Sequence, residues 1–269
     1  IRHPGIVRVF GQGMHGGLPW YAMALLEGRT LYGTIHTRPV FEPRRLLGVA
    51  RRLCDALAFL HGEGIVHCDL KPTNVLVLGT DQPVLFDFGL ATTFAGRVSR
   101  EALDLGEEGA GTVAYMAPEQ IQGDVVDART DLYALGCILY EIVVGAPPFG
   151  MKRPIEVAWA HLGEAPIPPS SLVDDVPPAL EALVLRLLAK RPADRLGYAV
   201  DVAAALGEIL GDEDEPLYEA PPPRSYLYRP TFAGREADLE TARPLLSSVK
   251  QRSGAVLFME GESGVGKTR

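Results

Sequence analysis

The sequence predicts an α+β fold in which a few short N-terminal strands precede a mostly helical region. Two apolar runs, residues 6–10 and 20–26, have the length of short buried strands and flank a glycine-rich turn. From Pro43 to His61, apolar residues recur every three or four positions, which is the spacing of one helix face. A second segment, which begins at Asp131, is apolar nearly all round, as expected for a helix in the middle of a domain.

The other elements follow from similar patterns. Residues 74–78 and 84–88, joined by the turn 79–83, predict a β-hairpin. Residues 90–120 show no sustained period, and an irregular stretch of that length inside a compact domain is usually functional. Two further helices are predicted, one over residues 177–192 with proline at its start and one over residues 199–210.

Composition and charge narrow the class of protein. The chain has 269 residues, of which 47% are apolar and 22% are charged, and this is typical of a globular protein. A net charge of −8 argues against a nucleic-acid surface driven by bulk charge. Three scattered cysteines favour a reducing cytoplasm over a disulfide framework or a metal cluster. No apolar run reaches the ~18 residues that a membrane-spanning helix needs.

Several short motifs occur in a fixed order. The stretch "HCDLKPTNVL" spans residues 67–76, "DFG" spans 87–89 and "APE" spans 117–119. Together they resemble the catalytic loop, the metal-binding triplet and the APE triplet of eukaryotic-type (bacterial) serine/threonine protein kinases. "DLYALG", residues 131–136, resembles the central helix of that family. Arg195 matches the arginine that pairs with the glutamate of the APE triplet.

The resemblance implies ATP and Mg²⁺ as cofactors and protein serine or threonine hydroxyls as substrates. Asp69 would accept or orient the proton of the attacking hydroxyl, Lys71 would offset charge at the γ-phosphate, and Thr112 would brace both. Asn74 and Asp87 would supply oxygen ligands to Mg²⁺. Phosphoryl transfer needs such charge neutralisation and alignment, and little covalent work from the protein.

The resemblance also assigns residues to an adenine pocket. Met23 would guard the back of the pocket, Ala24 and Leu26 would contact the base through their backbone, and Leu76 would form its apolar floor. The family's glycine-rich loop, its strand lysine and the glutamate that pairs with this lysine would all lie upstream of the first residue. The chain by itself is therefore expected to be weakly active or inactive.

A different motif, "GESGVGKT", spans residues 261–268 and fits G-x-x-x-x-G-K-[ST] in full. Backbone amides of such a loop, here between Gly261 and Gly266, cradle phosphates. Lys267 would reach the β- and γ-phosphates, and Thr268 would ligate Mg²⁺. Together with the strand pattern before it, this region resembles the entry to AAA-type or STAND-type signalling ATPases.

These observations predict three parts. Residues 1–210 would form a protein-kinase-like fold with a mostly helical large lobe and a partial small-lobe sheet. Residues 211–231, acidic and then proline-rich, would form a linker, and residues 232–269 would begin a P-loop α/β domain. The chain starts without methionine and stops just after a motif that opens a domain, so we expect it to be truncated at both ends.

Two other functions remain open from the sequence. A pseudokinase would act as a binding scaffold, although retention of the complete catalytic set argues against it. In the second alternative, the parent protein is chiefly a signalling ATPase or a transcriptional regulator whose kinase domain is a sensor. Sequence beyond Arg269 would decide that question. No nucleic-acid partner and no membrane segment is evident.

Cys68 is the residue at which the catalytic-loop motif departs from most regulated members of the family. Those relatives carry an arginine there, which clamps a phosphate on the activation loop. Cysteine has no positive charge, so we expect activity not to depend on phosphate at Thr92, Thr93 or Ser99. We expect Cys68 to be a small buried apolar residue, since a redox role would need a lowered thiol pKa.

Overall fold

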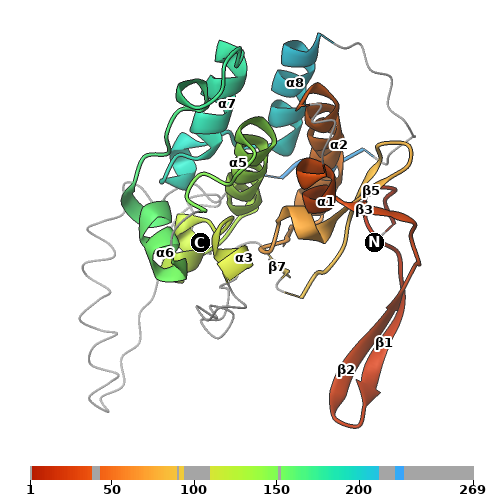
Figure 1. Ribbon diagram of the computed structural model, residues 1–269. Coiled ribbons are helices and arrows are strands. Elements are labelled where there is room, and N and C mark those ends of the chain that lie inside the picture. Colours follow the sequence, from red (N-terminus) through yellow and green to blue (C-terminus); the bar gives the residue numbers. More distant parts are fainter. Residues whose placement is uncertain are drawn as a thin grey trace, which may run out of the picture. The chain divides into compact units, whose positions relative to one another are not determined.

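The computed structural model describes residues 2–37, 43–89, 91–93, 110–150, 153–211 and 222–226 (Figure 1). All of them belong to the first of two units of the chain, residues 1–226. The second unit, residues 227–269, lies outside the described residues, and so do the glycine-rich motif at 261–268 and the elements predicted around it.

The N-terminal strands form a two-stranded antiparallel hairpin, β1 (Val9–His15) and β2 (Leu18–Met23), which projects from the helices in Figure 1. The prediction of two strands is confirmed, but their predicted position and burial are wrong. Most of the expected turn belongs to β1, and the side chains of Phe10 and Trp20 are 63% and 48% exposed. The reason is that this sheet has two strands and no second layer among the described residues covers it.

A three-stranded antiparallel sheet supports the segments that follow. It has the order β3 (Gly28–Thr30), β5 (Val75–Leu78) and β6 (Pro83–Leu85), so the hairpin predicted over residues 74–88 is confirmed. Gly28 is required at the first pairing, since a Cβ there would lie 2.5 Å from the carbonyl oxygen of Val77.

Two strands of two residues each pair elsewhere, β4 (Ile65–Val66) with β7 (Thr92–Thr93). The pairing joins the segment before residue 67 to the segment after residue 89. It therefore brings two of the sequence motifs close together.

The long helices are α2 (Pro43–Gly62) and α5 (Ala128–Val144), and both confirm the sequence prediction. The side chain of Asp127 caps α5 by accepting a hydrogen bond from the amide of Arg129, and Gly145 ends the helix at a φ of 84°. The other helices are α1 (Leu31–His36), α3 (Ala110–Val113), α4 (Pro118–Gln122), α6 (Pro154–Gly163), α7 (Pro178–Leu187) and α8 (Ala199–Leu210).

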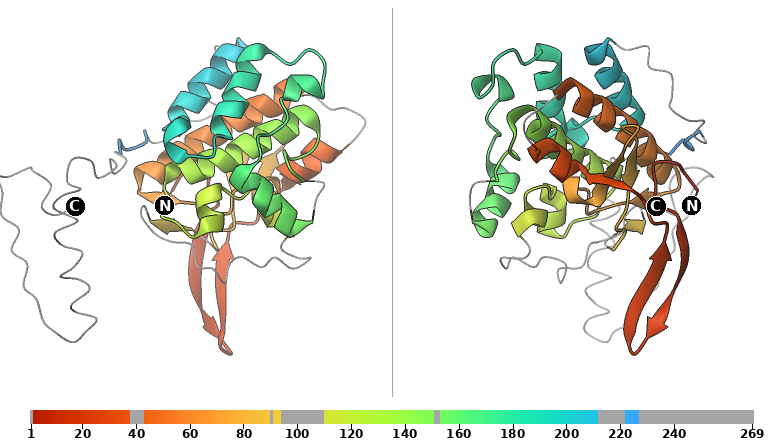
Figure 2. Two further views of the ribbon diagram at one scale, coloured as in Figure 1. Left: turned by 90° about the vertical axis from the view of Figure 1, so that its left-hand side faces the viewer. Right: turned by 45° about the vertical axis from the view of Figure 1, so that its right-hand side comes forward.

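Helix α5 occupies the centre of the helical region. It packs against α2 and α7, and α2 also packs along α8 (Figure 2). Leu132, Leu135 and Leu139 of α5 are fully buried, and burial of each such side chain contributes about 2 kcal/mol. Within the residues described above, no helix is both long enough and apolar enough to cross a bilayer.

Several short elements were not expected from the sequence. Helix α3 and strand β7 lie within residues 90–120, which were predicted to be irregular, and helix α4 begins there and ends at Gln122. Helix α1 is six residues long, too short to show a helical period, and the same holds for α3 and α4. Helix α6 is ten residues long, and its apolar residues follow one another closely, which hides the period.

Candidate catalytic site

The catalytic-loop motif is held by one buried carboxylate on α5. Oδ2 of Asp131 accepts hydrogen bonds from the amide of His67 (2.9 Å) and pairs with Nε2 of His61 (2.8 Å). Oδ1 accepts from the amide of Cys68 (2.9 Å). Burial by itself would raise the pKa of Asp131, but His61, His67 and the amide hydrogen bond lower it below its usual value. The carboxylate of Asp131 is therefore charged, and it anchors the catalytic loop to the central helix.

Four of the predicted site residues meet in one cluster. Nζ of Lys71 donates to Oδ2 of Asp69 (2.9 Å) and to Oγ1 of Thr112 (2.8 Å). Nδ2 of Asn74 donates to the same Oδ2 (2.9 Å) and to the backbone oxygen of Asp69 (2.9 Å). Two donors thus fix one carboxylate oxygen, and Oδ1 of Asp69 has no hydrogen-bond partner among the described residues. That oxygen is available to accept the proton of a hydroxyl group.

The segment that carries Asp87 is joined to the catalytic loop through the residues on either side of it. The amide of Phe86 donates to the backbone oxygen of Asn74 (3.1 Å), and the ring of His67 lies 4.9 Å from that of Phe88. Asp87 has a φ of 62°, a conformation that costs a non-glycine residue about 1 kcal/mol and is found often at functional sites. His67 is fully buried and packs against this segment, which is a structural role.

The donor set of Asn74 and Asp87 fits Mg²⁺. The amide nitrogen of Asn74 is used by Asp69, which leaves its side-chain oxygen for a cation. Mg²⁺ prefers oxygen ligands, keeps several waters and needs few protein groups. No group of three or more histidine, cysteine or acidic side chains that would hold a metal occurs in the described part of the chain.

The APE triplet is fixed to the rest of the fold by buried polar contacts. Glu119 forms a two-pronged ion pair with Arg195, at 2.7 and 2.8 Å, and accepts from the hydroxyl of Thr130 at 2.9 Å. The pairing predicted for Arg195 is thereby confirmed. The next residue, Gln120, donates to the backbone oxygen of Cys68 (2.7 Å), so α4 also holds the catalytic loop.

Cys68 packs as a neutral residue. It is 5% exposed and clusters with Val66 and Val126. Burial raises the pKa of its thiol, and the nearby Asp131 raises it further, so the thiol stays protonated. The backbone of Thr92 lowers this pKa and offsets part of the rise. The segment just after the DFG triplet is therefore held by the backbone pairing of β4 with β7, and Cys68 supplies no charge to hold it.

The residues predicted for the adenine pocket lie on the N-terminal strands and β5. Met23 ends β2 and is 43% exposed, and the amide of Ala24 donates to the backbone oxygen of Arg8 (2.8 Å). Leu26 is half-buried in the segment that leads to β3, and Leu76 pairs with β3. Gly261, Gly266, Lys267 and Thr268 lie outside the described residues.

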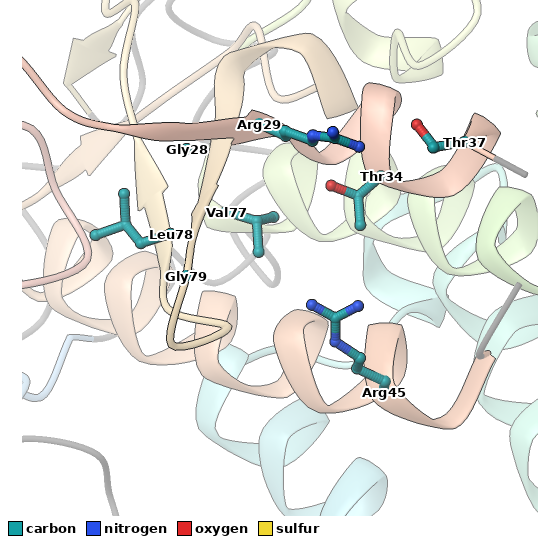
Figure 3. Close-up of a pocket in the computed structure, with 8 residues that line it drawn as sticks. All are labelled: Gly28, Arg29, Thr34, Thr37, Arg45, Val77, Leu78 and Gly79. Carbon is teal, nitrogen blue, oxygen red and sulfur yellow. The ribbon is translucent and has the colours of Figure 1, made fainter. Parts of the chain in front are cut away.

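A separate cavity of about 440 Å³ lies between the β3–β5 pair and helices α1 and α2 (Figure 3). Arg29, Thr34 and Arg45 are among its lining residues, and Arg45 is held by Asp81 on the turn between β5 and β6 (2.8 Å from Nε). None of the predicted site residues lines it, so this cavity is distinct from the catalytic cluster.

Sequence reasoning missed several residues that position the site. His61, Gln120 and Glu141 were not singled out, yet Glu141 is buried and accepts from the hydroxyl of Tyr115 (2.6 Å). For Glu141 there was a signal in the sequence, because it is an acidic residue in an otherwise apolar helix. A buried carboxylate needs a partner. Distant partners of these residues lie 26 to 105 residues away in sequence and carry no local signal.

The fold and the cluster together define the class of protein. A helical region with small sheets places the Asp69 loop, the Asp87 triplet and the Glu119–Arg195 pair in the arrangement of a protein kinase domain. The protein kinase domain family matches residues 1–205, and the chain belongs to this family.

Relatives with curated descriptions narrow the class further. The chain is 36% identical over 274 residues to the serine/threonine-protein kinase PknB of Mycolicibacterium smegmatis. The aligned region covers 95% of this chain and 42% of the relative. It is 39% identical over 220 residues to PknB of Mycobacterium tuberculosis, covering 79% and 34%. A probable PknB of Corynebacterium glutamicum is 37% identical over 217 residues, covering 78% and 33%. The chain is thus a protein kinase domain similar to these serine/threonine-protein kinases, and it spans a third to two fifths of their length.

Proposed function

We propose that the protein transfers the γ-phosphoryl group of ATP to serine or threonine hydroxyls of other proteins. The observation that carries this proposal is the cluster at Asp69, in which two donors fix Oδ2 and leave Oδ1 open. An oriented carboxylate with a free oxygen is what a general base needs in order to accept a proton from a hydroxyl.

Each residue of the cluster has a part in this reaction. Asp69 orients the hydroxyl and accepts its proton, while Lys71, held between Asp69 and Thr112, offsets negative charge on the transferred group. Asn74 and Asp87 hold Mg²⁺, which when bound neutralises charge on the phosphates. Met23, Ala24, Leu26 and Leu76 line the adenine pocket in this proposal.

Transfer of label from ATP tests the proposal directly. The full-length protein is incubated with γ-labelled ATP, Mg²⁺ and a mixed protein substrate, and the labelled amino acids are identified after acid hydrolysis. We expect phosphoserine or phosphothreonine, and no label when the metal is chelated. Label on tyrosine alone, or transfer that persists without metal, would contradict the proposal.

We also propose a wider organisation, which is supported by the sequence alone. The motif at residues 261–268 would open a P-loop nucleotide-binding domain after the linker 211–231, so that the kinase domain belongs to a larger kinase–ATPase regulator.

The three free cysteines of the kinase domain support a reducing, cytoplasmic location.

Control by activation-loop phosphate is not expected. Replacement of Thr92, Thr93 and Ser99 together by alanine in the full-length protein should leave turnover within about threefold of wild type, because Cys68 offers no charge to bind a phosphate. The measurement is steady-state turnover with a protein substrate. A loss beyond about tenfold, some 1.4 kcal/mol of transition-state stabilisation, would show that the loop does need phosphate.

A further inference from the structure

The segment 222–226, which follows the last helix of the kinase domain, is packed against the C-terminal end of α2 (blue in Figure 2). The surface that it contacts, here called the helix-end surface, consists of His61, Gly62, Glu63 and Tyr198. Three kinds of contact hold it there, and they are independent of one another.

The closest contact is between backbones. A Cβ at Gly62 would lie 2.6 Å from the amide nitrogen of Arg224 and 2.7 Å from its carbonyl oxygen. Real Cβ atoms do not approach backbone atoms so closely, so only glycine admits the segment at this position. Gly62 lies at the end of α2, where its backbone is helical and where alanine would suit the helix equally well or better.

Side chains add two further contacts. Nε of Arg224 lies 3.3 Å from a carboxylate oxygen of Glu63, an exposed pair that gives orientation more than strength. The half-buried ring of Tyr226 lies edge-on to the ring of His61, at 6.0 Å, and 5.1 Å from the ring of Tyr198.

His61 connects this surface to the catalytic loop. Its ring is fully buried between Tyr226 and Asp131, and Nε2 lies 2.8 Å from Oδ2 of Asp131. The two oxygens of Asp131 accept the amides of His67 and Cys68, which directly precede the catalytic aspartate. The path from Tyr226 to the loop therefore has three consecutive contacts.

We infer that the helix-end surface is a docking surface for residues 222–226, and that docking of this segment steadies the catalytic loop through His61 and Asp131. Tyr226 is a positioning residue in this account and touches neither nucleotide nor substrate. In this account, a conformational change beyond residue 226 that displaces the segment also alters the catalytic loop. The effect on turnover rests on the proposed kinase activity, whereas the effects on docking and on the loop do not.

The substitution Gly62→Ala tests the inference in the full-length protein, because the added methyl group displaces the segment without touching the site. Gly48→Ala is the matched control on the same helix, where a Cβ would meet only Arg52, at 3.9 Å. In Gly62→Ala, trypsin should cut after Arg224 about tenfold faster than in wild type. The amides of His67 and Cys68 should exchange hydrogen about fivefold faster.

Tyr226→Ala should reproduce the faster amide exchange with α2 left unaltered, and Tyr226→Phe, which keeps the ring, should restore slow exchange. We expect kcat to fall in Gly62→Ala and Tyr226→Ala while KM for ATP stays unchanged, as for a residue that positions the loop. If the wild-type protein itself showed no turnover, only the proposed kinase activity would be refuted. The cleavage after Arg224 and the amide exchange at His67 and Cys68 would still test docking and its effect on the loop.

Three results would overturn the inference. Cleavage after Arg224 at the wild-type rate in Gly62→Ala would show that the segment does not dock on this surface. Faster cleavage with unchanged exchange at His67 and Cys68 would show that docking does not reach the loop. Equal effects in Gly48→Ala would show damage to the helix and no specific contact.

Discussion

Replacement of Asp87 by asparagine should lower kcat by at least about a hundredfold, because the substitution removes the charged metal ligand and with it neutralisation of the phosphates. Asparagine has nearly the same shape and tolerates the left-handed backbone that Asp87 adopts (φ 62°). The protein should therefore fold normally. Steady-state turnover with saturating ATP and Mg²⁺ gives the measurement.

Asp175→Asn is the matched control for this change. Asp175 is exposed, has the same backbone conformation (φ 59°) and makes no contact with the catalytic cluster. Its replacement should leave turnover unchanged. If Asp87→Asn kept more than a tenth of wild-type turnover, the assignment of Asp87 as a metal ligand would be wrong.

Arg195→Met should have the largest effect on stability. It leaves Glu119 buried without its counter-charge, since the side chain of Arg195 is fully buried and that of Glu119 is 6% exposed. Breaking a buried ion pair from one side costs about 3–5 kcal/mol. Urea unfolding should show a loss of this size in the free energy of unfolding.

Arg191→Met, four residues away, provides the comparison. The side chain of Arg191 is 80% exposed and lies 3.9 Å from Asp194, so its loss should change the free energy of unfolding by less than about 0.5 kcal/mol. Equal losses in the two variants would mean that the Glu119 pair does not hold the fold.

The sequence predicted the long elements, and the catalytic and metal-binding roles of the site residues remain predictions. The helix at Pro43 was found because its apolar residues repeat a helical period, and the helix at Asp131 because a long segment is apolar nearly all round. The hairpin at residues 74–88 was found because two apolar runs flank a polar turn. Asp69, Asn74 and Asp87 were found because their spacing along the chain matches a known constellation. In the structure Asp69, Lys71, Asn74 and Thr112 meet in one cluster.

What the sequence missed depends on contacts between distant segments. Phe10 and Trp20 are exposed because β1 and β2 form a sheet of only two strands among the described residues. The number of strands in a sheet cannot be predicted from a local sequence pattern. The role of His61 depends on Asp131, seventy residues on, and that of Gly62 on Arg224. In the sequence, a glycine at the end of a helix indicates only where the helix stops. The structure shows that Gly62 also leaves room for the backbone of Arg224.

The central claim is that the cluster at Asp69 transfers phosphate and does not merely bind nucleotide. One experiment compares the full-length wild-type protein with its Asp69→Asn variant, measuring both labelled phosphate on protein serine and threonine and the affinity for Mg-ATP. We predict transfer by the wild type, a loss of about a hundredfold or more in Asp69→Asn, and the same nucleotide affinity in both. Nucleotide binding without transfer in the wild type, or equal transfer in both proteins, would contradict the account.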